Sequence, residues 1–411
     1  MALYEEKAHK LSELEEEQAR ESEAVVNELE GQRVFGAQHY EFWLISGISL
    51  LWSLFQLYIV VEPINSTITR SVHLSFGILL AFLIYPMFKK TYFLQKIRWF
   101  GFTLAAIGVG TASYIAVFYE EISQRPGDYI ALDIIVALVG IVILLEAGRR
   151  VLGFALSIIA IVFLSYDVLG PYMPELIIHK GASLNKLAGH MFLTTEGIFG
   201  VPLGVSAGFV FLFVLFGSLL DKAGAGEYFI NLAFAMLGKY RGGPAKASVV
   251  ASGFTGIISG SSIANTVTTG TFTIPLMKKA GFRPEQAGAV EVASSTNGQL
   301  MPPVMGAAAF IIAEFLGMAY TDVIVAAFIP AFVSYFALFY IVHLEALKLG
   351  LKGMNDQDIP PKWKTFVTGI HYLIPIFFLM YTLMVLRESA ASAAFNAIML
   401  LMMLMVVQHP F

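Results

Sequence analysis

Two clusters of small hydroxyl and amide residues interrupt an otherwise apolar stretch of the sequence between residues 247 and 304. The first cluster contains Ser259, Gly260, Ser261, Ser262, Asn265 and Thr266, and residues 294–299 of the second read SSTNGQ. Non-helical backbone is tolerated at membrane depth only where it is buried in protein or lines a cavity. Two such breaks in neighbouring segments therefore predict the binding site of a transporter.

The first cluster predicts a helical hairpin whose limbs run from about 245 to 258 and from about 265 to 278. At its tip the carbonyl end of one helix meets the amide end of the next, and these ends carry opposite partial charges. Carbonyl and hydroxyl oxygens suit a small hard cation, and free amides suit a carboxylate or phosphate. Gly260 allows a tight turn close to a ligand. Asn265 can both donate and accept, so it could cap the second limb and still contact a substrate.

The second cluster predicts a broken span over residues 284–316. Its first limb runs from Pro284 to Thr296 and ends at Asn297 and Gly298. Pro302 and Pro303 would open the second limb, because the amides of a first helical turn have no helical partner anyway. The two tips would face each other near the middle of the bilayer. The candidate site residues of this segment are Thr296, Asn297, Gly298 and Pro302.

Other polar residues in the apolar segments admit less specific explanations. A lone serine or threonine in a membrane helix usually bonds back to its own backbone, and small residues usually serve packing. We interpret five residues in this way: Ser248, Ser252, Thr268, Thr269 and Thr271. Glu291 and Glu314 are costly at membrane depth, so both are candidate intramembrane acids. Each could equally brace a helix or lie near an interface.

The composition requires a bilayer as the solvent for most of the chain. Hydrophobic residues make up 57% of the 411 residues and charged residues only 14%, whereas a soluble protein has about 25% charged residues. The net charge of −4 argues against a nucleic-acid partner. The absence of cysteine excludes disulfides and thiol catalysis. The eight histidines show no paired metal spacing, so no metal site is assigned to them.

Nine stretches have the roughly 20 apolar residues that a spanning helix needs. They lie at about 42–61, 71–88, 99–118, 130–146, 151–169, 201–220, 322–343, 366–386 and 391–409. Segment 183–196 is shorter and amphipathic, which indicates an interfacial or re-entrant segment. The sequence thus predicts an all-α polytopic membrane protein with about nine to ten spanning helices, a re-entrant hairpin and a broken helix.

The distribution of basic residues predicts a cytoplasmic N-terminus. With that orientation, only five lysines and arginines fall in outside loops: Arg70, Arg125, Lys180, Lys186 and Arg387. The hairpin 244–281 would then enter and leave on the cytoplasmic face. A shift in composition near residue 147 divides the chain further. We expect a charged cytoplasmic arm (1–41), a four-helix scaffold block (42–147) and a transport block (148–411).

The segments GFTGIISGSSIANTVTTG and EVASSTNGQLMPPVMGAA, with the earlier LTTEGIFGVPLGVSAGF, strongly resemble one family. It is the fused permease of tripartite ATP-independent periplasmic (TRAP) transporters, in the subtype served by TAXI-type binding proteins. The resemblance extends from about Gly181 to Gly350. The first four spans are similar, more weakly, to the small membrane subunit fused in front of the large one.

This resemblance implies a sodium-driven importer of organic anions, such as dicarboxylates, 2-oxo acids or amino acids. It implies a TAXI-type periplasmic binding protein as partner, an elevator-like mechanism, an inner-membrane location, and no cofactor besides the coupling sodium ions. The residues of both clusters would fall in the sodium and substrate region, with the individual ligands not separable. It implies a transport protein and not an enzyme.

The sequence departs from this family in one respect. Transport domains of the family contain two inverted repeats, each with a hairpin and a broken helix, whereas this chain has one set before Phe411. We therefore expect half of the site to be missing and the chain alone not to transport, either because the chain is truncated or because a second chain supplies the missing repeat.

Three other functions stay open at this point. The first is a sodium-coupled carboxylate transporter of another elevator family that works without a binding protein. The second is an intramembrane hydrolase that uses Ser261 or Ser262, which would need a histidine at the same depth. The third is a non-transporting partner of another subunit.

Overall fold

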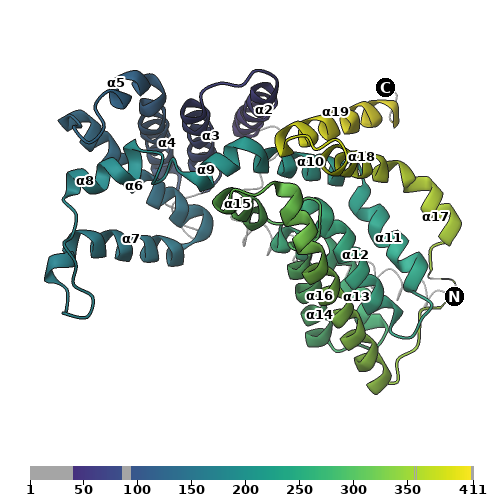
Figure 1. The fold of residues 1–411 in the computed structure, drawn as a ribbon. Helices are drawn as coiled ribbons and strands as arrows, with labels where there is room; N and C mark the ends of the chain where they lie inside the picture. The colour runs from purple at the N-terminus through teal and green to yellow at the C-terminus, as the bar shows by residue number, and fades with distance from the viewer. Residues whose placement is uncertain (1–39, 86–93, 356, 358, 409–411) are drawn as a thin grey trace. The chain divides into compact units, whose positions relative to one another are not determined.

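The computed structural model describes residues 40–85, 94–355, 357 and 359–408 (Figure 1). Every regular element among them is a helix, which confirms the predicted all-α class. Contacts divide the chain into two compact units, residues 1–207 and 208–411. The charged arm lies outside the described residues except for its last two positions, and the basic pair Lys89 and Lys90 lies outside them as well.

Nine helical segments of the described residues are long and apolar enough to cross a membrane, and each overlaps one predicted span. They are Phe42–Val61, Ser66–Ile84, Phe100–Val117, Ala131–Leu152, Phe154–Tyr172, Val201–Lys222, Tyr320–Lys348, Lys362–Met384 and Ala390–Val407. Such segments satisfy their own backbone hydrogen bonds, as a spanning segment must in lipid. The chain is a multi-pass membrane protein.

The first unit is a bundle whose central helices pack closely in pairs. Its helices are α2 (Tyr40–Val61), α3 (Ser66–Ile84), α4 (Leu94–Val117), α5 (Tyr119–Ser123), α6 (Ala131–Leu152), α7 (Phe154–Leu169), α8 (Leu184–Ala188) and α9 (Val201–Val205). Helix α3 packs along α4, and α6 contacts α3, α4 and α7. The predicted interfacial segment 183–196 forms α8 and a π-helical turn η2 (Gly189–Leu193) that packs on α6.

Gly140 of α6 makes room for the buried ring of Phe192 from η2. A Cβ at Gly140 would lie only 2.3 Å from the Phe192 ring. Helix α3 holds the segment after η2 in place through two polar contacts. Arg70 donates a 2.7 Å hydrogen bond to the carbonyl of Phe199, and a ring nitrogen of His73 lies 3.0 Å from Ser206 Oγ.

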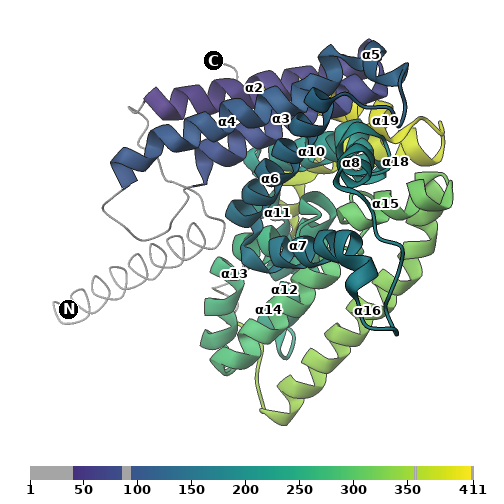
Figure 2. The same cartoon turned by 90° about the vertical axis from the view of Figure 1, so that its left-hand side faces the viewer.

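The second unit contains the segments with the two polar clusters. Its helices are α10 (Phe211–Lys222), α11 (Ala225–Leu237), α12 (Gly243–Ser259), α13 (Ser262–Lys279), α14 (Pro284–Gly298), α15 (Ala307–Leu316), α16 (Tyr320–Lys348), α17 (Lys362–Gly369), α18 (Leu373–Met384) and α19 (Ala390–Gln408). Helices α12, α13 and α14 contact one another, and α16 packs on α12 and α14 (Figure 2). Val249, Met277, Phe282 and Val342 form the centre of this packing.

Helix α11 was not predicted from the sequence, because no span or limb was expected between residues 220 and 244. It has 13 residues, and its buried side chains include Phe229, Ile230 and Phe234. Apolar runs of 10–14 residues are too short to span a bilayer and usually form buried core helices. Helix α11 fits this description, because it packs along α12.

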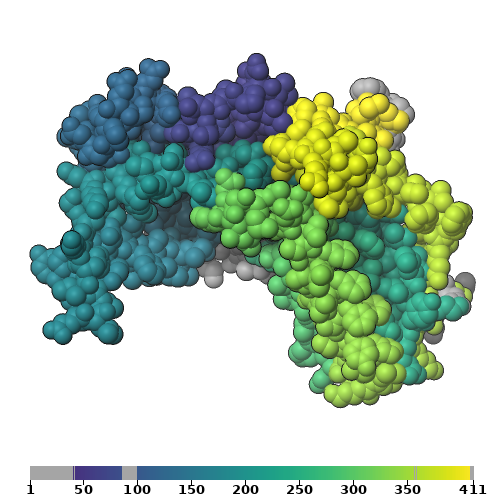
Figure 3. Space-filling view, in the orientation of Figure 1, coloured from purple at the N-terminus to yellow at the C-terminus, as the bar shows by residue number. Residues whose placement is uncertain are grey.

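One face of α16 carries exposed apolar side chains, and the green atoms of this part of the chain lie at the surface in Figure 3. Phe328, Phe332 and Phe336 follow one another at four-residue spacing, and each is more than 60% exposed. Residues four apart share one face of a helix, so these rings form one stripe, and consecutive rings are stacked. Lipid tails are the natural cover for such a face in a membrane protein.

Candidate functional site

The first polar cluster lies at the turn of a helical hairpin, as predicted. Helix α12 ends at Ser259, Gly260 has a positive φ of 59°, and α13 begins at Ser262. A Cβ at Gly260 would lie 2.4 Å from the carbonyl oxygen of Met305, so the turn needs glycine for its conformation and for this approach. The N-cap of α13 is Ser261, whose hydroxyl accepts from the amide of Ala264 at 3.3 Å. The predicted capping role of Asn265 is therefore wrong, because α13 begins three residues before it.

The second cluster lies at a break between α14 and α15, with two corrections to the predicted limits. Helix α14 continues to Gly298, and α15 begins only at Ala307. Pro302 and Pro303 therefore do not open the second limb. A residue before proline is disfavoured in helical conformation, so the Pro-Pro pair extends the break. Gly306, in an extended conformation, is the N-cap of α15 instead.

The two breaks lie against each other, as predicted. The side chain of Gln299, which follows α14, donates a 3.0 Å hydrogen bond to Ser262 Oγ at the start of α13. Gly260 contacts the backbone of Met305 within the second break. Two helix ends of the hairpin and the non-helical segment 299–306 thus meet in one place.

Asn265 is enclosed between α12 and α14 and is 1% exposed. Its amide nitrogen donates to the carbonyl of Ser252 at 3.0 Å and to Ser252 Oγ at 3.1 Å, and its amide oxygen accepts from Thr255. A Cβ at Gly298 would lie 3.1 Å from the same amide nitrogen. Both amide protons of Asn265 are used within the protein, so in this conformation Asn265 ties the hairpin together.

Glu291 of α14 is fully buried, and four hydroxyl groups lie within hydrogen-bond distance of its carboxyl oxygens. Ser248 of α12 donates to Oε2 at 2.7 Å, and Ser295 of α14 donates to Oε1 at 3.1 Å. Thr269 and Thr273 of α13 donate to Oε1 and Oε2. These donors come from three helices, so the carboxyl group joins the hairpin to α14.

A chain of hydrogen bonds connects Glu291 with Asn265. Ser295, which donates to Glu291, lies 3.0 Å from the hydroxyl of Ser252, and Ser252 in turn accepts from Asn265. The interpretation of Ser248 and Ser252 as residues that bond to their own backbone or serve packing is wrong, because both hydroxyls bond across helices. Thr269 does bond its own helix at the Asn265 carbonyl but also reaches Glu291. Thr271 bonds only the Thr268 carbonyl, as predicted.

The network that surrounds Glu291 was not predicted, although the helical spacing of its members indicates polar faces on three helices. Ser248, Ser252 and Thr255 follow the i, i+4, i+7 spacing of one helix face. On α13 the polar residues Asn265, Thr269 and Thr273 are four apart, as are Glu291 and Ser295 on α14. Three polar helix faces of this kind predict a shared buried interface.

The other predicted site residues differ in whether their polar side chains already have a partner. Thr266 and Asn297 are half-buried, and in the described part of the chain their side chains have no hydrogen-bond partner. Thr296 donates to the carbonyl of Val292 in its own helix, and Ser259 donates to the carbonyl of Ser261. Glu314 on α15 is exposed, unlike Glu291, and is not a member of the network.

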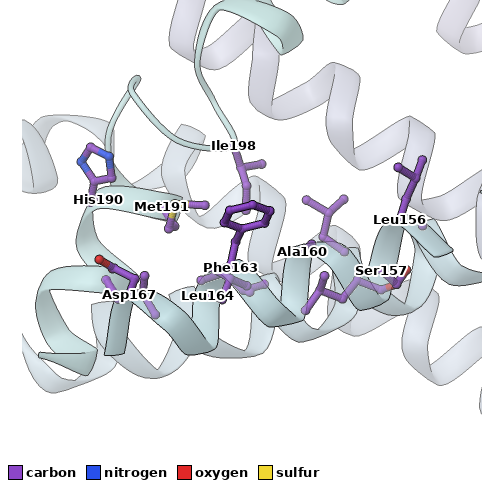
Figure 4. Close-up of a pocket in the computed structure, with 14 residues that line it drawn as sticks. Leu156, Ser157, Ala160, Phe163, Leu164, Asp167, His190, Met191 and Ile198 are labelled. Atoms are coloured by element: carbon purple, nitrogen blue, oxygen red, sulfur yellow. The ribbon is translucent and has the colours of Figure 1, made fainter. Parts of the chain in front are cut away.

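The first unit contains a cavity of about 560 Å³ between α6, α7 and the η2 turn (Figure 4). Its lining is mainly apolar, with Phe163, Leu164, Met191 and Ile198 among the residues drawn. The few polar side chains include Ser157, which already bonds the Leu145 carbonyl at 3.1 Å. This cavity contains none of the predicted site residues. No group of three or more potential metal ligands occurs in the described residues.

Comparison with known proteins matches residues 139–410 to the family described as "Tripartite ATP-independent periplasmic transporter, DctM component". The C4-dicarboxylate TRAP transporter large permease protein of Vibrio cholerae is 34% identical over 31% of this chain and 27% of its own length. Its counterpart in Rhodobacter capsulatus is 29% identical over 38% of each chain. The sialic acid TRAP transporter permease of Haemophilus influenzae is 30% identical over 34% of this chain and 22% of its own length.

This chain spans about a third of the length of the curated relatives that it matches. The family match covers both polar clusters and all helices of the second unit. The chain therefore belongs to the DctM component of the tripartite ATP-independent periplasmic transporters, a family of transport permeases and not of enzymes.

Proposed function

We propose that the chain acts as the permease of a secondary importer that takes up small organic anions together with sodium ions. The contact between the α12–α13 turn and the break between α14 and α15 is the observation that supports this proposal. The carbonyl end of α12 and the amide end of α13 lie side by side, and the partial charges of such ends suit a cation and an anion respectively. Thr266 and Asn297 stand next to these ends with side chains that have no partner in the described part of the chain.

The substrate class follows from the chemistry that helix ends recognise and from the names of relatives. A helix N-terminus binds carboxylate or phosphate groups. The relatives from Vibrio cholerae and Haemophilus influenzae are named for C4-dicarboxylates and sialic acid, which are both carboxylates. We therefore propose a carboxylate as the anion, such as a dicarboxylate, a 2-oxo acid or an amino acid. The buried Glu291 network would hold the hairpin and α14 together while the site moves by an elevator-like mechanism.

The proposed partner is a periplasmic substrate-binding protein of the TAXI type, and the proposed location is the inner membrane with a cytoplasmic N-terminus. The helical hairpin α12–α13 would be re-entrant. The family description as a periplasmic transporter supports a partner on that side of the membrane.

Two measurements on the purified 411-residue chain test the proposal. In detergent, sodium chloride should raise the thermal unfolding midpoint, whereas choline chloride at the same concentration should not, because only a bound ligand stabilises the folded state by mass action. A panel of succinate, 2-oxoglutarate, glutamate and sialic acid should stabilise further in sodium. Equal midpoints in sodium and choline would contradict sodium coupling.

Uptake into proteoliposomes distinguishes the proposed importer from its main rival. Sodium-dependent uptake that needs the added binding protein supports the tripartite mechanism. Sodium-dependent uptake without it would support a carboxylate transporter that works alone. The hydrolase alternative has no support at the hairpin, since no histidine is among the hydrogen-bond partners of Ser261 and Ser262 in the described part of the chain.

A further inference from the structure

We propose that Glu291 is a positioning residue that makes binding of the anion depend on prior binding of sodium. Its buried negative charge would attract the cation to the meeting point of the two breaks. The same charge would repel a carboxylate until the cation is bound. This inference rests on the proposed function, since it assigns the order of the two ligands to one side chain.

The environment of Glu291 supplies hydroxyl donors that can compensate a buried carboxylate. A carboxylate can accept about four hydrogen bonds, whereas a protonated carboxyl group must use one oxygen as a donor. Ser248, Thr273 and Ser295 donate to the two oxygens of Glu291, and the Thr269 hydroxyl divides its one proton between Glu291 and the Asn265 carbonyl. Burial of a charge is tolerated only with such compensation.

Ion pairing does not compensate the charge of Glu291 among the residues that the structure describes. No lysine, arginine or histidine forms an ion pair with Glu291 in the described part of the chain. Hydroxyl groups redistribute the charge but do not cancel it. A net negative potential therefore extends to the groups that follow along the network.

The network ends at Asn265, one residue before Thr266 in the sequence. Three consecutive hydrogen bonds lead from Glu291 through Ser295 and Ser252 to the amide of Asn265. Asn265 precedes Thr266, and its amide nitrogen lies against Gly298, which follows Asn297. Three hydrogen bonds limit the separation to under about 10 Å, and charges this close interact strongly in a buried setting.

The change Glu291→Gln tests the proposal because it keeps the size of the side chain and removes the charge. The hydroxyl groups can turn to satisfy an amide, since each can donate or accept. We expect the sodium concentration that gives half of the thermal stabilisation to rise on the order of tenfold. We also expect the anions of the panel to stabilise this variant in choline, where the unmodified chain shows no such effect.

These opposite effects separate a charge effect from a packing effect. A merely structural role of Glu291 would weaken the binding of both ligands, which would overturn the proposal. The matched control is Glu314→Gln, because Glu314 is an exposed glutamate outside the network; it should leave both responses unchanged. An unchanged sodium response in Glu291→Gln, with a clear response in the unmodified chain, would also overturn the proposal.

Two further results keep the test decisive. If the unmodified chain does not respond to sodium, the proposed function itself fails. If Glu291→Gln does not fold, infrared difference spectra of the unmodified chain with labelled glutamate replace it. Sodium, but not choline, should then shift the carboxylate band of a buried glutamate, and this shift should persist in Glu314→Gln. The absence of any such shift would contradict the inference.

Discussion

Gly256 of α12 and Gly298 of α14 pack backbone against backbone, so the hairpin and the broken helix cross without side chains between them. A Cβ at Gly256 would lie 2.6 Å from the Cα of Gly298. Next to this crossing, Asn265 fills the space beside Gly298. The close approach is what allows the hydroxyl groups of α12 to reach α13 and α14.

The change Gly256→Ala should lower the stability of the chain. The obstacle at 2.6 Å is backbone, which cannot turn away as a flexible side chain can, and overpacking of this kind costs about 1–3 kcal/mol. We expect a lower thermal unfolding midpoint in detergent. The control is Gly288→Ala in α14, where a Cβ meets no atom within 4 Å. That change should be neutral or slightly stabilising, because alanine is the better helix former. Equal midpoints for the two variants would contradict the tight crossing.

The changes Asn265→Ala and Thr266→Ala should separate a structural role from a binding role in adjacent residues. Asn265→Ala removes the buried hydrogen bonds of Asn265 with Ser252 and Thr255, and each is worth about 0.5–1.5 kcal/mol. Thr266→Ala removes a hydroxyl that has no partner among the described residues, so its effect on stability should stay within about 0.5 kcal/mol.

Sodium titration completes this comparison. Thr266→Ala should need more sodium for half of the thermal stabilisation if its hydroxyl contributes to the proposed site. The opposite pattern, with a stable Asn265→Ala and an unstable Thr266→Ala, would contradict the assignment of Asn265 as the buried, hydrogen-bonded residue of the two.

The spans were predictable because each depends on a local property, namely about 20 apolar residues in a row. The hairpin turn was predictable for the same reason, since Gly260 and the hydroxyl residues around it are consecutive. Helix α11 was missed because its 13 residues are too few for a spanning helix, and they are held by packing on α12.

The roles of the site residues depend on contacts between helices, and these contacts could not be predicted from a single sequence. Glu291 and Glu314 look alike in the sequence, and only the packing of α12 and α13 shows that Glu291 is buried and Glu314 exposed. Asn265 was correctly placed beside the hairpin turn. Its hydrogen bonds within the hairpin followed from the crossing of Gly256 and Gly298, which no local pattern predicted.

The change Gly140→Ala should destabilise the first unit. Phe192 is 1% exposed and its ring lies 2.3 Å from the position of the added Cβ. The ring is enclosed by the core of this unit, so it cannot move aside freely, and we expect a loss of about 1–3 kcal/mol. Gly110→Ala in α4 is the control, because a Cβ there meets nothing within 4 Å. A thermal midpoint for Gly140→Ala equal to that of the control would show that η2 does not pack on α6 in this way.

The absence of cysteine from the chain allows a direct test of the proposed orientation. We expect a cysteine at Glu175, in a loop predicted to lie outside, to react with a membrane-impermeant maleimide added to intact cells. A cysteine at Lys352, in a loop predicted to lie inside, should react only after the membrane is permeabilised. Both residues are exposed, so their reactivity should report the side of the membrane and not burial in the protein. The unmodified chain should stay unlabelled in both conditions. Labelling of Lys352→Cys in intact cells, with Glu175→Cys protected, would reverse the orientation, and the hairpin α12–α13 would then enter the membrane from the periplasmic side.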